Sequence, residues 1–127
     1  MNDLPLPTAA ELEILRVLWK RGPSTVRAVH EALGESRGTG YTTVLKLMQI
    51  MHAKGLVTRN EAERTHVYAA AVQPDRTEGR LVADLAERAF GGSAARLALR
   101  ALSEEPCSPE ELAEVRRLLD ALEARGA

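Results

Sequence analysis

Residues 41–55 constrain this chain more than any other segment, because they predict one helix with two unlike faces. At about 100° per residue, an apolar row falls on one side of the helix and a polar row falls on the other. The apolar row is Val44, Leu47, Met48 and Met51, and the polar row is Thr42, Lys46, Gln49 and Ala53, flanked by Thr43. The apolar side is expected to pack against a core. The polar side suits the major groove of DNA, where such groups bind base edges and phosphates.

A first helix is predicted near the N-terminus from its start and stop signals. Thr8 and Glu11 have the spacing of a capping box, and the helix is expected to end near Arg21, before Gly22-Pro23. Its apolar positions predict a broad buried stripe of Leu12, Leu15, Val17, Leu18 and Trp19.

A second helix is predicted over residues 25–33, with Ser24 as its cap and Gly34 at its end. Its inward positions are Val26, Val29 and Leu33. A polar, glycine-rich segment, residues 35–40, then leads into the third helix.

Two short segments of strand character follow the third helix. Residues 56–59 and 65–68 lie on either side of a polar turn at residues 60–64. Three helices followed by a hairpin are typical of a winged helix, in which the third helix enters the major groove and the hairpin lies along the backbone or minor groove. We therefore predict a winged-helix DNA-binding domain over residues 1–72.

From Pro74 onward the chain is rich in Ala, Leu and Arg, and helices are predicted at residues 75–90, 93–102 and 109–124. A segment this short makes a marginal core alone, so we predict that residues 73–127 form a helical dimerisation domain. The residues expected in the dimer interface are Leu81, Leu85, Phe90, Leu112, Val115, Leu119 and Leu122. The predicted fold class is mainly α with a small two-stranded β-hairpin: an N-terminal winged helix-turn-helix followed by a C-terminal helical dimerisation domain.

The charge of the chain is unevenly distributed. The formal net charge is -1 over 127 residues, but residues 1–72 carry nine Lys/Arg against seven Asp/Glu, and residues 37–68 carry five against two. That local excess of +3, rather than the total, would attract phosphates. No apolar run is long enough for a membrane span, no secretory signal is visible, and Cys107 is the single cysteine, so a cytoplasmic protein without membrane insertion is expected.

The predicted DNA contacts fall into two groups. Base recognition is expected from Lys46 and Gln49, with Thr42 and Thr43 shared between bases and phosphates. Phosphate contacts are expected from the hairpin and the helix starts, at Arg64, His66, Ser24, Thr25 and Tyr41. Each of these residues also has an ordinary structural explanation, as a solvated helix face, a hairpin polar residue, a helix cap or a packing tyrosine.

No motif predicts an enzyme, a cofactor or a metal site. The chain has no catalytic triad, phosphate-binding loop, paired-carboxylate motif or metalloprotease signature. His30, His52, His66 and Cys107 do not fall at the close spacings that build a metal site on one helix. The competing interpretation is a protein-binding adaptor, because winged helices also mediate protein–protein contacts without specific DNA binding.

Several motifs, in this order and spacing, together carry a family resemblance. They are Ala9 and Glu11-Leu12-Glu13-Ile14-Leu15 with Leu18-Trp19, then Gly40-Tyr41-Thr42-Thr43-Val44, Lys54-Gly55-Leu56-Val57 and Arg64-Thr65-His66-Val67-Tyr68. Over residues 5–72 they resemble the penicillinase repressor family, which includes the repressors of β-lactamase and methicillin resistance, and the C-terminal helices match in pattern. The resemblance implies a dimeric repressor that binds dyad-symmetric operators near its own and neighbouring genes.

The resemblance also implies how such a repressor leaves DNA. In the family, release often follows cleavage by a membrane metalloprotease receptor that senses β-lactams, at an Asn-Phe bond in staphylococcal members. The corresponding position here is Arg100-Ala101, so the Asn-Phe bond is absent, which counts against β-lactam-triggered proteolysis. The partner that the resemblance implies is a membrane sensor protease or another inactivating protease. Cys107 stands alone, unlike the cysteine-rich tail of copper-responsive relatives. Ile50 stands where relatives usually carry Arg, which predicts the loss of one phosphate or base contact.

Overall fold

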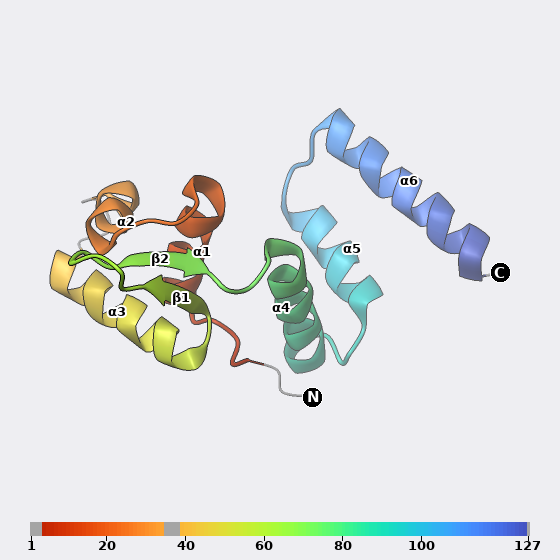
Figure 1. Cartoon of the computed structure of the whole chain (residues 1–127). Helices are drawn as coiled ribbons and strands as arrows, with labels where there is room; N and C mark the ends of the chain where they lie inside the picture. Colours follow the sequence, from red (N-terminus) through yellow and green to blue (C-terminus); the bar gives the residue numbers. More distant parts are fainter. Residues whose placement is uncertain (1–3, 35–38, 127) are drawn as a thin grey trace. The chain divides into compact units, whose positions relative to one another are not determined.

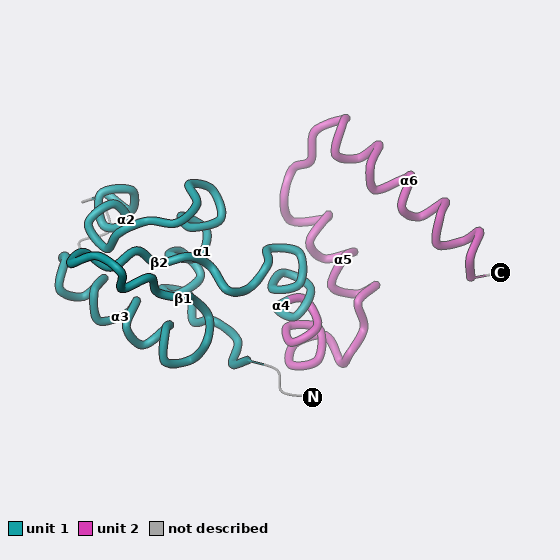
Figure 2. Tube along the Cα trace, viewed as in Figure 1, with its two compact units in different colours: residues 1–81 teal, residues 82–127 magenta. Residues whose placement is uncertain are grey.

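The computed structural model describes residues 4–34 and 39–126, which are mainly helical with a two-stranded antiparallel sheet, as predicted (Figure 1). The elements in chain order are α1 Ala9–Arg21, α2 Val26–Leu33, α3 Tyr41–Lys54, β1 Val57–Asn60, β2 Val67–Ala70, α4 Pro74–Ala89, α5 Ala94–Glu104 and α6 Pro109–Gly126. The chain divides into two compact units, Met1–Leu81 and Val82–Ala127, within α4 (Figure 2). The units divide after Leu81, whereas the sequence predicted a domain boundary after residue 72. The functions predicted for the two domains, DNA binding and dimerisation, stay predictions.

The first unit has one apolar core, to which each element from α1 to β2 contributes. Its buried members are Ile14, Leu15, Leu18, Val26, Val29, Val44, Met48, Met51, Leu56, Val57 and Tyr68. Ile14, which the predicted stripe left out, is fully buried, whereas Trp19 is half-buried and its ring N–H donates to the Val72 carbonyl at 2.9 Å. A core of this kind stabilises the fold through the apolar area it removes from water. It therefore fixes which face of each helix is left for solvent.

Local signals set the helix ends of this unit. The Thr8 N–H donates to the Glu11 carboxylate at 2.9 Å, and the Glu11 N–H donates to the Thr8 hydroxyl at 3.2 Å, so the predicted capping box is confirmed. Gly55 ends α3 in the left-handed region, with φ of 87°, where other residues would be strained. The glycine-rich segment predicted at residues 35–40 lies largely outside the described residues.

Ser24 does not cap α2, so that prediction is wrong. The helix begins at Val26, and its cap is Thr25, whose hydroxyl accepts a hydrogen bond from a first-turn N–H at 3.1 Å. The Ser24 main chain instead forms two 2.8 Å hydrogen bonds with Tyr68, and its hydroxyl donates to the Gly22 carbonyl at 2.9 Å. A long-range pairing therefore decides which of two neighbouring hydroxyls is free to cap.

The hairpin forms, but its second strand begins later than predicted. The sequence placed this strand at residues 65–68, whereas β2 spans Val67–Ala70. The paired residues are Val57 with Ala70, Thr58 with Ala69, Arg59 with Tyr68 and Asn60 with Val67. Tyr68 also bonds to the main chain that precedes α2, and this second partner helps to hold the strand in register. The connecting turn, residues 61–66, therefore takes in His66, which the sequence had placed in the strand.

The second unit consists of the end of α4 with α5 and α6, and local caps define its helices. Ser93 caps α5 by accepting the Arg96 N–H at 3.1 Å. Ser108 and Glu111 form a second capping box, with hydrogen bonds of 2.9 Å and 3.0 Å. In the described ranges, no helix combines the length and the apolar character that a membrane span needs.

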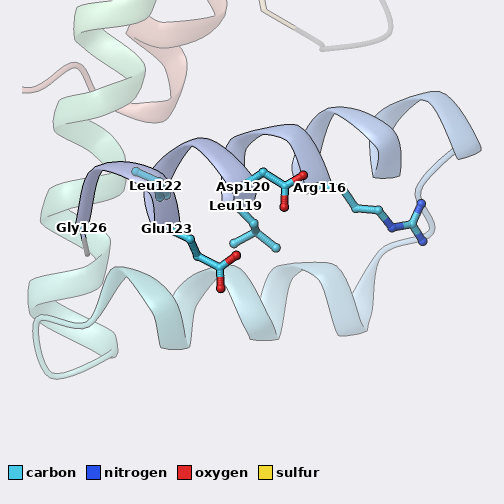
Figure 3. Close-up of a pocket in the computed structure, with 6 residues that line it drawn as sticks. All are labelled: Arg116, Leu119, Asp120, Leu122, Glu123 and Gly126. Carbon is cyan, nitrogen blue, oxygen red and sulfur yellow. The ribbon is translucent and has the colours of Figure 1, made fainter.

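This unit leaves most of its large apolar side chains exposed. Among its described residues, Ala86 is the buried apolar side chain. The exposed ones are Val82, Leu85, Leu99, Leu102, Leu112, Leu118, Leu119 and Leu122. A hollow along α6 is lined by Arg116, Leu119, Asp120, Leu122, Glu123 and Gly126, all from that one helix (Figure 3). The hollow is thus an open helix face rather than an enclosed ligand cavity.

Candidate nucleic-acid interface

The third helix, α3, turns a polar face outward because its apolar residues are locked into the core. Val44, Met48 and Met51 are fully buried. The exposed side chains of this helix are Tyr41, Thr42, Thr43, Lys46, Gln49, Ile50 and Ala53. Lys46 forms no ion pair within the described part of the chain, so its ammonium group is free to bind an external acceptor. An ammonium, an amide and two hydroxyls on one helix face can make the hydrogen bonds by which base edges are recognised in the major groove.

Tyr41, at the start of α3, is held by two residues of α2. The His30 ring meets it edge to face, with ring centroids 6.1 Å apart and an interplanar angle of 86°. The Arg27 guanidinium carbon lies 5.9 Å from the centroid of the Tyr41 ring, within cation–π range. Arg27 was not predicted as a site residue, because its approach to Tyr41 depends on the packing of α2 against α3, which no local spacing in the sequence signals.

Arg64 is the unpaired arginine of the hairpin, because Arg59 is held by its neighbours. Arg59 donates to the Glu61 carboxylate at 2.6 Å. A hydrogen bond with the Tyr68 hydroxyl, and then the bond with Glu61, raise the pKa of Arg59 further, while Arg59 holds the pKa of Glu61 below its usual value. Arg64 is exposed at the turn and forms no ion pair within the described residues, and His66 is half-buried. Arg64 is therefore the hairpin cation best able to meet a phosphate.

Internal ion pairs neutralise part of the positive charge predicted for residues 37–68. Lys54 Nζ lies 2.8 Å from a carboxylate oxygen of Glu11, a residue that is only 2% exposed. This pair joins the end of α3 to the start of α1, and the arginine of β1 is paired in the hairpin. Arg37, which was counted in the same charge, lies outside the described residues. The charge left for phosphate is that of the unpaired cations on α3 and in the turn of the hairpin.

The structure brings some of the predicted contact residues together and separates others. One hollow of about 360 Å³ is lined by Thr25, Tyr41, Gln49, Arg64 and His66, along with other residues of α2, α3 and the hairpin. Thr42, Thr43 and Lys46 lie on the open face of α3, outside that lining. Ser24 is only 8% exposed and its hydroxyl is bonded within the protein. Ser24 therefore has little surface for the predicted DNA contact, and it is not part of the interface proposed below.

Three packed helices followed by a two-stranded hairpin, with a polar third helix facing outward, define a winged helix-turn-helix, a class of DNA-binding fold. The chain belongs to the penicillinase repressor family, whose model matches residues 7–121. This is a family of transcriptional repressors and not of enzymes.

Individual relatives extend over most of the chain. The transcriptional regulator BlaI of Mycobacterium tuberculosis is 35% identical over 115 residues, covering 90% of this chain and 83% of the relative. The penicillinase repressor of Bacillus licheniformis is 24% identical over 121 residues, covering 94% of each chain. The solution structure of the DNA-binding domain of the repressor BlaI superposes with a TM-score of 0.51 at 23% identity, covering 58% of this chain and 90% of that domain. This last likeness bears on the fold alone, and it supports the winged helix.

Proposed function

We propose that this protein is a DNA-binding transcriptional repressor that acts in the cytoplasm as a homodimer on dyad-symmetric operators. Membership in a family of penicillinase repressors supports this class of function, and β-lactamase-type or related stress genes are its proposed targets. The observation that carries the proposal is the outward face of α3, which presents Thr42, Thr43, Lys46 and Gln49, and none of these forms an ion pair within the described residues.

The proposed contacts divide between bases and backbone. Lys46 and Gln49 bind base edges in the major groove, and Thr42 and Thr43 are shared between bases and phosphates. The backbone contacts are assigned to Arg64, His66, Thr25 and Tyr41. Base contacts select the sequence and phosphate contacts fix the register of the protein on the duplex.

The apolar surface of the second unit supports the homodimer. Leu85, Leu112, Leu119 and Leu122 are exposed, and Phe90 and Val115 are half-buried. Leu81, the last residue of the first unit, is also half-buried. Exposed apolar rows of this kind are energetically favourable to cover, and a second copy offers the same surface. A two-fold dimer would then place two copies of α3 on half-sites about one helical turn of DNA apart.

The proposal includes release from DNA by a membrane sensor protease or another inactivating protease. Arg100-Ala101, which stands in the place of the Asn-Phe bond of staphylococcal members but differs from it in both residues, is exposed on α5, and Arg100 pairs with Glu104 at 3.1 Å. Cleavage there would remove α6 from the rest of the chain. A repressor that loses α6 would lose part of the surface proposed to hold the dimer together.

The main alternative is a protein-binding adaptor, and salt-dependent DNA binding separates the two. Fluorescence anisotropy should compare dyad-symmetric DNA from upstream of the protein's own gene with a scrambled duplex, at several salt concentrations. A repressor binds the dyad selectively, and its affinity falls by roughly 0.9 log unit per log unit of salt for each phosphate neutralised. Equal, weak binding to both duplexes would favour the adaptor.

A further inference from the structure

The hollow between α2, α3 and the hairpin is lined by cations and hydroxyls. Arg27 enters it from α2, Arg59 from β1 and Arg64 from the turn of the hairpin. None of its described lining residues is Asp or Glu. Arg59 is partly neutralised by Glu61, but Arg27 and Arg64 form no ion pair in the part of the chain that the structure describes. The hollow therefore presents positive charge that nothing described in the protein compensates.

If the protein binds DNA as proposed, one strand of the duplex would lie across this hollow. In a winged helix on DNA, the third helix occupies the major groove and the hairpin reaches the backbone or the neighbouring minor groove. One sugar–phosphate strand separates those two grooves. That strand has to cross the space between α3 and the hairpin, and the positively charged hollow of about 360 Å³ lies there.

We propose that this hollow is a phosphate-binding cleft for the DNA strand between the two grooves, with Arg27 as its principal contact. The proposal rests on the proposed function and adds to it a site and a residue. Arg27 lies 5.9 Å from the centre of the Tyr41 ring, and His30 supports that ring from another side, with ring centroids 6.1 Å apart. The aromatic ring orients the guanidinium without neutralising it, so the group is prepared to bind a phosphate. Thr25 and Thr65 add hydroxyl donors to the same lining.

The first test removes Arg27 and follows the salt dependence of DNA binding. Arg27→Ala is compared with Arg16→Ala, which removes an exposed arginine of α1 that does not line the hollow. Log affinity falls as log salt rises, and the loss of one phosphate contact should make this fall less steep by about 0.9. The change should be the same on the operator and on the scrambled duplex. Arg16→Ala should leave the slope unchanged.

The role of the tyrosine ring has its own matched pair of variants. Tyr41→Phe keeps the ring that orients Arg27 and should lose only the phosphate contact assigned to the tyrosine hydroxyl, whereas Tyr41→Leu removes the ring as well and should weaken binding to both duplexes further. If Phe and Leu weaken binding equally, the hydroxyl rather than the ring matters, and the orienting role is wrong.

A complementary test removes the charge from the DNA. Uncharged methylphosphonates replace single phosphates along the operator. At the phosphate held in the cleft, the replacement should weaken operator binding by the wild-type protein about tenfold. It should leave operator binding by Arg27→Ala nearly unchanged. If both proteins lose affinity equally at every position, Arg27 binds none of these phosphates.

The possible results separate the cleft from the repressor function. Wild-type protein and Arg27→Ala with equal salt slopes would overturn the cleft, even if the operator is bound selectively. A lower slope for Arg27→Ala without any preference for the operator would support the cleft and overturn the sequence-specific repressor. A wild-type protein that binds no duplex at all would overturn both.

Discussion

Lys46 and Arg64 are both exposed and positively charged, but different elements hold them and they would meet different parts of a duplex. Lys46 lies on the outward face of α3 beside two threonines, where a helix reaches base edges. Arg64 lies in the turn between β1 and β2. A contact with a base edge distinguishes one sequence from another, whereas a contact with a phosphate does not. These two side chains should therefore separate specificity from general affinity.

We expect Lys46→Ala to weaken operator binding by about 1–3 kcal/mol and to relax sequence preference, because a base contact is lost. Arg64→Ala should weaken operator and scrambled DNA to a similar extent. Titration of each variant against both duplexes checks the contrast, with Lys20→Ala on the exposed side of α1 as the control. A similar loss on both duplexes for Lys46→Ala would falsify the base contact.

Ile50 is an apolar side chain on the outward face of α3, and 39% of it is exposed. Apolar side chains in the major groove recognise thymine by its methyl group. Replacing each operator thymine by uracil, which lacks that methyl, should reveal one position where the wild-type protein loses about 0.8 kcal/mol. Ile50→Ala should show no loss at that position. If no thymine gives this pattern, Ile50 contacts no methyl group.

At the scale of elements, helix ends followed from local sequence and the strand register did not. The capping boxes at Thr8 and Ser108 involve residues three apart, so their pattern is visible in the chain. The position of β2 depends on Tyr68, which pairs with Ser24 far away in the sequence. The same pairing buried Ser24 and moved the cap of α2 to Thr25. Both errors have one cause, a contact that no short window contains.

The candidate site shows the same division. The outward face of α3 could be predicted because helical periodicity separates its apolar and polar rows. The ion pair between Lys54 and Glu11 could not be predicted. This pair neutralises one of the cations counted from the sequence as available to bind phosphates. Arg27 was missed for a similar reason, since its place beside Tyr41 depends on the packing of two helices.

The pair of Glu11 and Lys54 links the first helix to the end of α3 and should make stability depend on pH. Burial favours a higher pKa for Glu11, but hydrogen bonds from Lys54 and the Thr8 N–H outweigh it and hold the pKa below its ordinary value of 4.5. A carboxyl group whose pKa is lowered by folding stabilises the fold fully above its unfolded pKa. That stabilisation is lost as the pH falls below about 4.5 and through the lower folded pKa.

We expect Lys54→Met to lower the free energy of unfolding by about 1–3 kcal/mol at pH 7, because it leaves the Glu11 carboxylate buried without its cation. The difference from wild type should shrink in acid, where Glu11 becomes protonated. Urea denaturation at pH 7 and in acid measures this difference in the free energy of unfolding, with Lys20→Met as the surface control. An equal difference at neutral and acid pH would show that Lys54 acts through packing rather than through its charge.

At the scale of the whole molecule, the second unit determines the proposed assembly. Leu119 and Leu122 lie on the open face of α6, and 54% and 43% of these side chains are exposed. Charges placed in an apolar interface are strongly unfavourable. We expect the double variant Leu119→Glu, Leu122→Glu to sediment as a monomer and to bind the full operator far more weakly than wild type. Glu114→Ala, an exposed change on the same helix, should remain dimeric.

The first unit should stay folded in the double variant, because its core lies entirely within its own elements. Chemical shifts of the core residues in α1 and α3 would check this. A variant that stays dimeric would place the contact between copies elsewhere on the molecule.

The exposed leucines of the second unit have a consequence for how the amount of this protein would control its genes. In the proposed dimer, these leucines are buried only when two chains associate, so the fraction of dimer depends on the concentration of the protein. When the chains are scarce relative to the dimer dissociation constant, the number of dimers rises with the square of the number of chains, so halving the chains leaves about a quarter of the dimers. If a cell continues to grow and divide after synthesis of the protein has slowed, dilution alone would then relieve repression steeply.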